Sequence, residues 1–392
     1  MDEVDILVVG GGVAGLTAAA VLASAGHQTL CIDAAPAEAG ARDSRTTAFL
    51  RPAVELLTEA GVWDRLSGAT APLDTMRLID AGGEMNEARE IADFHAAEIS
   101  EPPFGWNVAN RDMRQALIAQ CEALPAATLA FGVSLESLTP RRACQIARLS
   151  DGRTIRARLI VGADGRNSAV RDIAGIGAKR TSYGQKALVF TVAHDEPHQG
   201  VSTEIHRTGG PFTLVPLPDA DGPRSSIVWM ETAGEAMRLA ALSDAEFEQA
   251  LNERSLDVLG PLRAISPRAA WPIISLIAHR LTAPRIALVA EAAHVVPPIG
   301  AQGLNMSLAD IAALRDGIGD DPGAADSLAA YQRRWPELAA RVAGIDTLNR
   351  AAMAGAQPIR DLRRAGLGLI ARARPVRQTA MRMGLGVRDT RP

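Results

Sequence analysis

Three short segments of the chain combine glycine and acidic residues in a way that proteins use to hold a phosphorylated cofactor. They are Gly10-Gly11-Gly12-Val13-Ala14-Gly15, Gly162-Ala163-Asp164-Gly165 and Ala290-Glu291-Ala292-Ala293-His294, and each follows a run of apolar residues. A Gly-x-Gly-x-x-Gly motif alone is a weak signal. Acidic residues after two later apolar runs, with the Gly- and Pro-rich loop 297–303 after the last, favour a flavin site as the hypothesis.

The first segment has the features of a dinucleotide-binding turn. Gly10 allows the tight turn, Gly12 lets the backbone approach a pyrophosphate, and Gly15 permits close packing of strand and helix. The N-terminus of that helix would face the phosphates. Asp33 ends the next expected strand, where a carboxylate can accept hydrogen bonds from the ribose of an adenosine. This unit predicts a dinucleotide but does not distinguish a nicotinamide from a flavin.

The segment Gly300–Asn305 predicts a second helix N-terminus at the site. A helix that begins near Gly303, followed by Leu304, directs unpaired backbone N–H groups and the positive end of its dipole outward. Aimed at the pyrimidine ring of a flavin, these groups would stabilise the negative charge of the reduced form. An ordinary junction between a loop and a helix is the structural alternative.

The elements that must position these residues begin with a β-α-β unit over residues 6–32. Later elements follow from apolar periodicity and from turn residues. They are a loop and helix over 43–61, a hairpin over 73–93, a helix over 113–124, strands near 128–131, 144–149 and 154–161, antiparallel strands over 187–229, a helix over 244–259, and mostly helix from 304 onward.

This order predicts an α/β protein with a Rossmann-like cofactor domain, a β-rich antiparallel substrate domain that interrupts it, and a helical C-terminus. The cofactor domain is expected over 1–72, 98–180 and 279–358. The substrate domain is expected as the hairpin 73–97 and the segment 181–278, and the basic helical C-terminus covers 359–392.

Composition excludes several classes of protein. A hydrophobic content of 47% and a charged content of 22% are ordinary for a globular chain, and a net charge of −4 gives no reason to expect a nucleic-acid partner. Asp2, Glu3 and Asp5 exclude a basic signal peptide, and no apolar run is long enough to span a bilayer, so a cytoplasmic location is expected. The three cysteines are predicted to be buried thiols, and the histidines show no metal-ligand spacing.

Five segments carry a resemblance to a known family. They are Asp43-Ser44-Arg45-Thr46-Thr47-Ala48, Gly61-Val62-Trp63-Asp64-Arg65-Leu66, Gly162-Ala163-Asp164-Gly165-Arg166-Asn167-Ser168, Tyr183-Gly184-Gln185-Lys186-Ala187 and Gln302-Gly303-Leu304-Asn305. With them the chain resembles the class A flavoprotein monooxygenases, which have the fold of para-hydroxybenzoate hydroxylase. Within that family it is most similar to the ubiquinone-biosynthesis hydroxylases, and the resemblance covers nearly the whole length.

The resemblance implies roles for individual residues. Arg45 would reach the phosphates of FAD, and Arg111 matches an arginine that often contacts FAD. Asp164 and Gly165 would lie near the pyrophosphate and the path of the reduced nicotinamide.

In the third segment Glu291 stands where most relatives have an aspartate that holds the ribityl chain, and Pro298 would lie against the isoalloxazine ring. The chain departs from the family here. The usual Gly-Asp is Ala290-Glu291, and the usual Ala-Gly-Gln turn is Gly300-Ala301-Gln302.

The resemblance also implies the reaction. Reduced FAD would form a flavin hydroperoxide with O2, after reduction by a transiently bound NAD(P)H, and an electron-rich aromatic ring would take the distal oxygen. No catalytic base is assigned, and for His294 a structural role is favoured over a catalytic one. Alternation in the β-rich segment suggests Phe212, Leu214, Pro216 and Trp229 as pocket-lining residues.

For the ubiquinone-pathway relatives the substrate is a polyprenyl phenol, which resides at the membrane. From Arg360 onward the chain has nine arginines against Asp361 and Asp389. Such a basic helical segment could rest on the inner face of a membrane. The alternative is a terminal helix packed on the cofactor domain with a solvated arginine face.

Three other functions remain open at this stage. One is a hydroxylase of a small soluble phenol or of a polyketide-like ring. Another is a scaffold in a complex of biosynthetic enzymes, its catalysis lost with the altered third segment. A nicotinamide dehydrogenase is the third, and it would leave the second and third segments unexplained.

Overall fold

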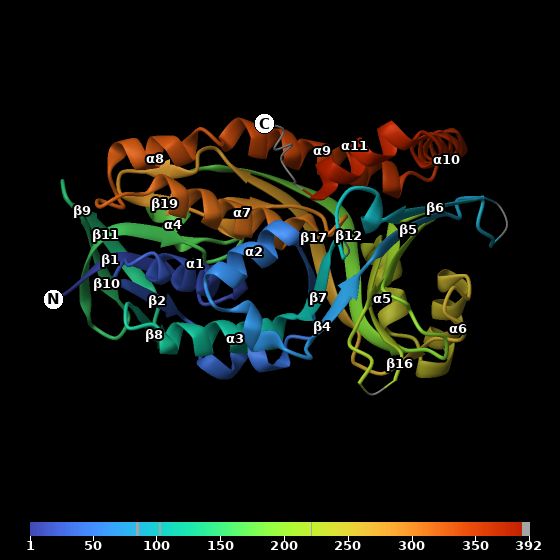
Figure 1. Ribbon diagram of the computed structural model, residues 1–392, viewed down its shortest axis with the longest axis horizontal. Helices are drawn as coiled ribbons and strands as arrows, with labels where there is room; N and C mark the ends of the chain where they lie inside the picture. The colour runs from blue at the N-terminus through green and yellow to red at the C-terminus, as the bar shows by residue number, and fades with distance from the viewer. Residues whose placement is uncertain (84–85, 102, 221, 386–392) are drawn as a thin grey trace.

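The computed structural model describes residues 1–83, 86–101, 103–220 and 222–385 (Figure 1). Its first sheet, at the left in Figure 1, has eight strands in the order β18-β19-β11-β1-β2-β8. In addition β10 pairs with β11, and β9 pairs with β10. The strands β19, β11, β1, β2 and β8 are parallel. Their bounds are β1 Asp2–Val9, β2 Thr29–Asp33, β8 Ala127–Phe131, β9 Leu135–Pro140, β10 Gln145–Leu149, β11 Thr154–Gly162, β18 Thr282–Ala283 and β19 Ile286–Leu288.

Helices cover this parallel sheet because its central strands are apolar on both faces. In β1 and β11 the runs Ile6–Val9 and Leu159–Val161 are buried. The helices that pack on this core are α1 Val13–Ser24, α2 Arg51–Glu59, α3 Asn110–Ala123, α7 Gln302–Gly317, α8 Ala325–Gln332 and α9 Trp335–Met353. The helix α4 Ala169–Ile173 and 3-10 helices at Ala37–Arg42, Trp63–Leu66, Ala96–Glu98 and Ala290–Ala292 lie in the connections.

A second sheet, at the right in Figure 1, has nine strands in the order β20-β17-β12-β15-β14-β13-β5-β6, with β16 added on β12. All its pairings are antiparallel except that of β13 with β5. The bounds are β5 Thr75–Asp80, β6 Glu90–His95, β12 Ala178–Ala193, β13 Val201–His206, β14 Pro211–Pro216, β15 Arg224–Thr232, β16 Arg263–Ala264, β17 Ala269–Ala278 and β20 His294–Val295. The predicted α/β architecture, with an antiparallel sheet inserted between parts of a parallel one, is confirmed.

One face of the second sheet is closed by α5 Ala233–Ala240 and α6 Asp244–Ser255. Phe212, Leu214 and Trp229 are buried in that core, against residues such as Phe247 of α6. The prediction that these three side chains line the substrate pocket is therefore wrong. Alternation separated the two faces of the strands correctly, but it could not indicate which face two helices would cover.

A third, three-stranded sheet has the order β3-β7-β4, with bounds β3 Thr46–Leu50, β4 Thr70–Leu73 and β7 Gly105–Ala109. It corrects the prediction of loop and helix over 43–61, because residues 46–50 pair with β7 before α2 begins. Five residues with Thr and Phe favour a strand once a partner strand is available.

The C-terminal segment forms the helices α10 Gln357–Arg372 and α11 Arg374–Leu385 along the upper right of the molecule (Figure 1). They pack on the β5–β6 hairpin of the second sheet, where Met381 joins a small core with Phe94 and Phe104. The alternative of packing on the cofactor domain is confirmed only in part, because Phe104 and the hydrogen bond from the Gln302 amide to the Gly384 carbonyl (2.9 Å) join these helices to segments 98–180 and 279–358 as well. Residues 386–392, which include Arg388, Asp389 and Arg391, lie outside the described residues. No helix in the described ranges is both long and apolar enough to cross a membrane.

Candidate cofactor-binding site

The three glycine- and acid-bearing segments meet at the carboxyl edge of the parallel sheet. Backbone hydrogen bonds join them there, from Gly10 N–H to the Ile32 carbonyl (2.8 Å) and from Ala163 N–H to the Val9 carbonyl (2.8 Å). The third is joined to the second by Val289 N–H, which donates to the Gly162 carbonyl at 2.9 Å. In open α/β sheets this edge is where ligands bind.

The glycines of the first segment have the two roles that their spacing predicts. A side chain would clash at Gly10 and Gly15, since a Cβ at Gly10 would lie 2.4 Å from the Ala163 oxygen and one at Gly15 would lie 1.8 Å from the Gly10 oxygen. Gly12 differs, because nothing lies within 4 Å of the position of its Cβ. Gly12 precedes α1, which has no side-chain cap and no acidic residue in its first turn. An uncovered backbone at an uncapped helix N-terminus fits a pyrophosphate.

Asp33, at the end of β2, is held beside this turn. One carboxylate oxygen accepts from Gly11 N–H at 2.5 Å and the other accepts from Ala35 N–H at 2.7 Å. A carboxylate can accept about four hydrogen bonds, so it retains capacity for the hydroxyl groups of a ribose.

Arg45 lies between the cofactor edge and the second sheet. Its guanidinium makes two hydrogen bonds of 2.8 Å to the Asp43 carboxylate and lies 4.7 Å from the ring centre of Trp271 in β17. Hydrogen bonding to Asp43 raises the pKa of Arg45, partial burial opposes this, and the charges of Asp43 and Glu291 raise it further. Arg45 therefore stays a cation at the junction of the two sheets, where cofactor phosphates can reach it.

Two arginines of α3 lie on this side of the molecule. Arg111 is exposed and pairs only with the adjacent Asp112 among the described residues, so its guanidinium is available to a ligand. Arg114 is a residue that sequence reasoning missed. Its guanidinium donates to the Gly11 carbonyl at 3.2 Å and lies 5.1 Å from the ring centre of Phe131. Its spacing of three residues from Arg111, which places both on one side of a helix, was the available signal.

In the second segment the side chain of Asp164 is used within the protein. Its carboxylate accepts hydrogen bonds from the Ser168 hydroxyl and from Val170 N–H (3.1 Å), and so holds the start of α4. Gly165 has a left-handed backbone (φ +83°) and nothing lies within 4 Å of the position of its Cβ. The backbone at Gly165 is thus the part of this segment that is open to a ligand.

Glu291 pairs with Arg166, a second residue that sequence reasoning did not single out. The Arg166 guanidinium donates to both carboxylate oxygens, at 3.2 and 3.3 Å. This pair brings the second and third segments together across the site. The residue before Glu291, Ala290, has a left-handed backbone with φ +55°.

The loop before α7 presents the second helix N-terminus. Ala301 is the N-cap residue with φ +56°, and α7 has neither a side-chain cap nor an acidic residue in its first turn. Nothing lies within 4 Å of the Cβ position of Gly303. Asn305 ties this turn to β3, because its amide accepts from Leu50 N–H (2.9 Å) and donates to the Ala48 and Ala301 carbonyls (both 2.7 Å). Asn305 positions the turn, and the N–H groups before it face outward.

This loop also packs on the second sheet. Pro298 is exposed, and the next residue, Ile299, packs on an apolar patch that we call the substrate face. The substrate face lies opposite the face that α5 and α6 cover. It consists of Tyr183, Ala187, Val189, Val228, Met230 and Ile273.

His294 lies in a buried ion pair or hydrogen bond, which agrees with the structural role that the sequence analysis favoured. Its Nε2 lies 2.6 Å from a carboxylate oxygen of Asp310 in α7, and both side chains are buried. The described residues contain no group of three His, Cys, Asp or Glu side chains that could hold a metal ion. The three cysteines are free and buried, as predicted.

Together these groups form a cradle that fits FAD. Open backbone at Gly12, Gly165 and Gly303 would meet the cofactor where a side chain would block it. Two uncapped helix N-termini would face its anionic groups. The substrate face beside Ile299 would place an apolar ring next to the flavin end.

Comparison with known sequences agrees with this geometry. The chain matches the FAD binding domain family over residues 3–333. It is 37% identical to the ubiquinone hydroxylase UbiL of Rhodospirillum rubrum, with 97% of this chain and 89% of that protein covered. It is 29% identical to the 3-demethoxyubiquinol 3-hydroxylase of Escherichia coli, with 98% of each chain covered.

Solved structures show the same fold. PqsL of Pseudomonas aeruginosa, in complex with 2-aminobenzoylacetate, superposes with a TM-score of 0.79 at 23% identity, over 94% of this chain and 100% of that one. The p-nitrophenol 4-monooxygenase PnpA of Pseudomonas putida superposes with a TM-score of 0.81 at 18% identity, over the whole of both chains.

Proposed function

We propose that this chain, which belongs to the FAD binding domain family and is an FAD-dependent monooxygenase, hydroxylates the aromatic ring of a polyprenylated ubiquinone precursor. The resemblance to the class A flavoprotein monooxygenases is confirmed by the family match and by its relatives. The observation that carries the substrate proposal is the 37% identity to a ubiquinone hydroxylase over 97% of the chain. The apolar substrate face beside the loop 297–303 supports it.

We assign the cofactor contacts from the geometry of the site. Gly10, Gly12 and Gly15 form the turn at which α1 would meet the pyrophosphate, and Asp33 would accept hydrogen bonds from the adenosine ribose. Arg45 and Arg111 are two of the cations on this side, and they would neutralise phosphate charge.

At the other end of the cofactor, Glu291 would accept from the ribityl hydroxyl groups, and Arg166 orients its carboxylate. The N–H groups of Gly303 and Leu304 would face the pyrimidine ring, held there by the bonds of Asn305 to β3. Pro298 would lie at the edge of the ring system.

When bound, FAD supplies the reduction by NAD(P)H and the activation of O2. The protein positions the substrate next to the flavin and keeps water away from it. The apolar side chains of the substrate face would exclude water, and the uncapped N-terminus of α7 would favour negative charge on a bound flavin. Within the substrate face Tyr183 is a polar group; burial and its hydrogen bond to Asp346 raise the pKa of its phenol to about 12, so it stays neutral.

We also propose the division of the chain that the sequence suggests, with a cofactor domain over 1–72, 98–180 and 279–358 and a substrate domain over 73–97 and 181–278. The pairing of β5 with β13 supports it, because the hairpin joins the second sheet although residues on both sides of it join other sheets.

Product analysis tests the substrate proposal. The holoenzyme is incubated with NADPH or NADH, O2 and a prenylated phenol, and in parallel with the same phenol without its tail. Hydroxylation with a kcat/KM at least about tenfold higher for the prenylated phenol is expected, since each buried CH2 contributes about 0.8 kcal/mol. Equal values would instead favour a hydroxylase of small soluble phenols, and flavin retention without turnover would favour a scaffold.

Attachment to a membrane surface is a second proposal, carried by the outer face of α10 and α11. The exposed side chains Leu362 (73%), Leu369 (64%), Val376 and Met383 (72%) recur every seven residues. Over 357–385 the chain has seven arginines and one acidic residue, Asp361. Apolar side chains rimmed by cations suit an anionic leaflet.

Vesicle sedimentation tests this attachment. Leu362→Glu combined with Leu369→Glu should reduce binding to anionic vesicles at least about tenfold, because both side chains would lose burial in the bilayer. The matched control is Ile265→Glu, whose side chain is 54% exposed. Ile265 directly follows β16, which Figure 1 shows at the lower right, whereas α10 and α11 lie at the upper right. Binding unchanged by the double substitution would contradict the proposal, and the apolar face would then be left for another enzyme of the pathway.

A further inference from the structure

A cluster of arginines surrounds the turn 207–210 between β13 and β14, apart from the cofactor cradle. Arg254 at the end of α6 donates to the Ile205 and Gly210 carbonyls at 3.2 and 2.8 Å. From the other side, Arg363 of α10 donates to the Arg207 carbonyl at 3.3 Å. The members of this group, which we call the arginine cluster, are Arg89, Arg207, Arg254, Arg360 and Arg363.

Three carboxylates lie near these five arginines, namely Asp80, Asp361, which pairs with Arg89, and Glu231, whose charge acts on Arg254. Asp80 is 1% exposed and is shared by two members, Arg89 (2.6 Å) and Arg363 (3.0 Å). In the described part of the chain, the guanidinium groups of Arg207 and Arg360 make no hydrogen bond or ion pair. Two cations of the cluster therefore have no partner of their own.

Unpaired donors lie at the centre of the cluster. Arg254 is only 4% exposed, yet its Nε and Nη1 have no hydrogen-bond partner, and neither does the buried Nε of Arg360. Burial lowers the pKa of Arg254 to about 9; the Glu231 carboxylate offsets part of this, and the charges of Arg207 and Arg363 add to it. A buried donor without a partner is destabilising, and such groups call for a ligand, a water or a functional explanation.

We propose that the arginine cluster binds a phosphate group. The donors without a partner belong to Arg254 in α6 and to Arg360 in α10, and the turn 207–210 contributes Arg207 as a further cation near Arg254. A tetrahedral oxyanion can accept hydrogen bonds from several directions and carries enough charge to neutralise two unpaired guanidinium groups. The phosphate is either a free ion or the headgroup of a phospholipid.

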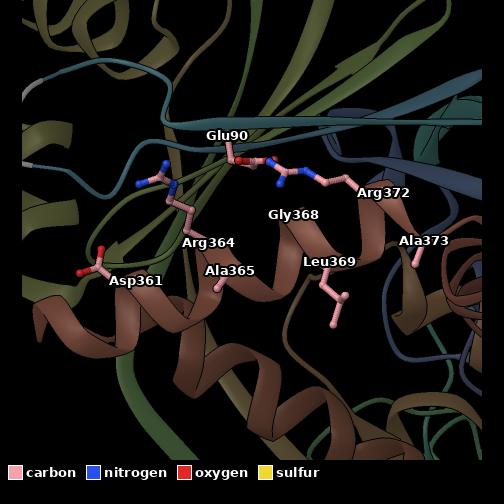
Figure 2. Close-up of a pocket in the computed structure, with 8 residues that line it drawn as sticks. All are labelled: Glu90, Asp361, Arg364, Ala365, Gly368, Leu369, Arg372 and Ala373. Atoms are coloured by element: carbon pink, nitrogen blue, oxygen red, sulfur yellow. The ribbon is translucent and has the colours of Figure 1, made fainter.

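A route to the cluster is present at the surface. Thr208 in the turn is exposed, and Arg207 and Arg360 are half-buried. A groove of about 650 Å³ runs along α10 beside the cluster, and its lining residue Asp361 pairs with Arg89 at 2.7 Å. Figure 2 shows Arg364 and Arg372 extending from α10 toward the side of the groove where Glu90 lies. The lining of this groove holds two arginines, Arg364 and Arg372, together with the carboxylates Glu90 and Asp361.

The turn that the phosphate would order also contacts the substrate face. Gln185 of β12 donates to the Gly209 carbonyl at 2.7 Å, and a Cβ at Gly210 would lie 2.8 Å from the Cβ of Met230. Ligand binding would therefore fix one border of the substrate face. This consequence does not depend on which aromatic ring is hydroxylated.

Calorimetry with inorganic phosphate tests the site. The FAD-loaded protein is used, so that the cofactor occupies its own phosphate sites, and sodium chloride replaces phosphate at equal ionic strength as the reference. We expect saturable binding of phosphate. Arg207→Gln and Arg360→Gln should each weaken it about tenfold or more, the effect of losing one charge-assisted hydrogen bond. Both side chains are half-buried, so these variants are expected to fold. Arg148→Gln on β10, with the same change of charge, should leave the affinity unchanged.

Vesicles distinguish the two sources of phosphate. If the headgroup is the ligand, Arg207→Gln should weaken binding to phosphatidylglycerol vesicles and inorganic phosphate should compete with them. If the free ion is the ligand, vesicle binding should be the same in Arg207→Gln and in the unchanged chain, while calorimetry still detects phosphate. No heat of binding in the unchanged chain, or equal affinity in all three variants, would overturn the proposal and leave ordered water as the partner of Arg254.

Discussion

Two alanines beside the cofactor cradle should make the protein more stable when they are replaced by glycine. Ala290 has φ +55° and Ala301 has φ +56°, in the left-handed region that a Cβ disfavours. They are the two positions at which the family that the chain resembles has glycine. At both positions where the chain departs from the family pattern, the backbone therefore has a conformation that favours glycine, the residue of the family.

The magnitude follows from two opposing terms. A left-handed backbone costs an L-residue about 1–2 kcal/mol relative to the right-handed region. Exchange of alanine for glycine costs about 0.4–1 kcal/mol through the larger entropy of the unfolded chain. The net gain is about 0.5–1 kcal/mol per site, or about 1–2 kcal/mol for the double variant. With about 2.1 cal/mol/K per residue over 392 residues, the double variant should melt about 1–3 °C higher.

Thermal unfolding, followed by circular dichroism on protein stripped of flavin, measures this change without any contribution from cofactor binding. The matched control is Ala340→Gly, at an exposed site within α9 where the backbone is helical. It should lower the stability by about 1 kcal/mol. The reasoning would be refuted if Ala290→Gly and Ala301→Gly destabilised the protein as much as the control.

Three further predictions concern side chains of the site. Glu291→Ala should lower the flavin content of the purified protein and change its stability by less than about 1 kcal/mol, since the pair with Arg166 is partly exposed; an unchanged ratio of flavin to protein would remove Glu291 from the site. His294→Ala should cost about 3–5 kcal/mol in urea unfolding because it breaks a buried pair, while FAD reduction in the folded protein stays the same; slower reduction at unchanged stability would instead assign His294 to the chemistry. Burial tends to raise the pKa of Asp43, but its hydrogen bonds with Arg45 outweigh this and hold it below the usual value. The stabilisation is therefore present above the unfolded pKa of about 3.9 and is lost as the pH falls through the lowered folded value. Release of FAD below about pH 4 should be steeper in the unchanged chain than in the variant Asp43→Asn, and identical titrations would argue against the role of this pair.

Much of the cofactor edge could be predicted because it depends on local rules. Gly10, Gly12, Gly15 and Asp33 belong to one β-α-β unit, in which turn, helix and strand follow each other directly. The start of α7 near Gly303 was predictable for the same reason. In such a unit the backbone geometry and the chemistry of the side chains are both set by residues close in sequence, so both can be predicted from the same motif.

Other features depend on contacts that are distant in sequence. Trp229 and Met230 are neighbours in β15, yet one lies under α5 and α6 and the other lies on the substrate face. The alternation of side chains along a strand shows only that Trp229 and Met230 point to opposite faces of the sheet, and it does not show which face the helices cover. The use of the Asp164 carboxylate by Ser168 could not be read from the motif either, because the same residues suit an open site and a capped helix.

The partners of the C-terminal arginines could not be predicted either, because those partners are distant in sequence. Nine arginines after residue 359 suggested a basic tail. Several are instead bound within the fold, as Arg363 is to Asp80 and Arg377 to Glu98. The position of Asp80, 283 residues away from Arg363 in the chain, is a property of the second sheet and had no local signal.

The most direct measurement is the visible spectrum of the purified protein during one catalytic cycle. We expect a bound flavin that bleaches when NADH or NADPH is added without oxygen. On addition of O2 and a prenylated phenol, reoxidation should yield one hydroxylated ring per flavin. A colourless protein that cannot be reconstituted with FAD, or a flavin that reoxidises without forming any hydroxylated product from the phenols tested, would contradict the account.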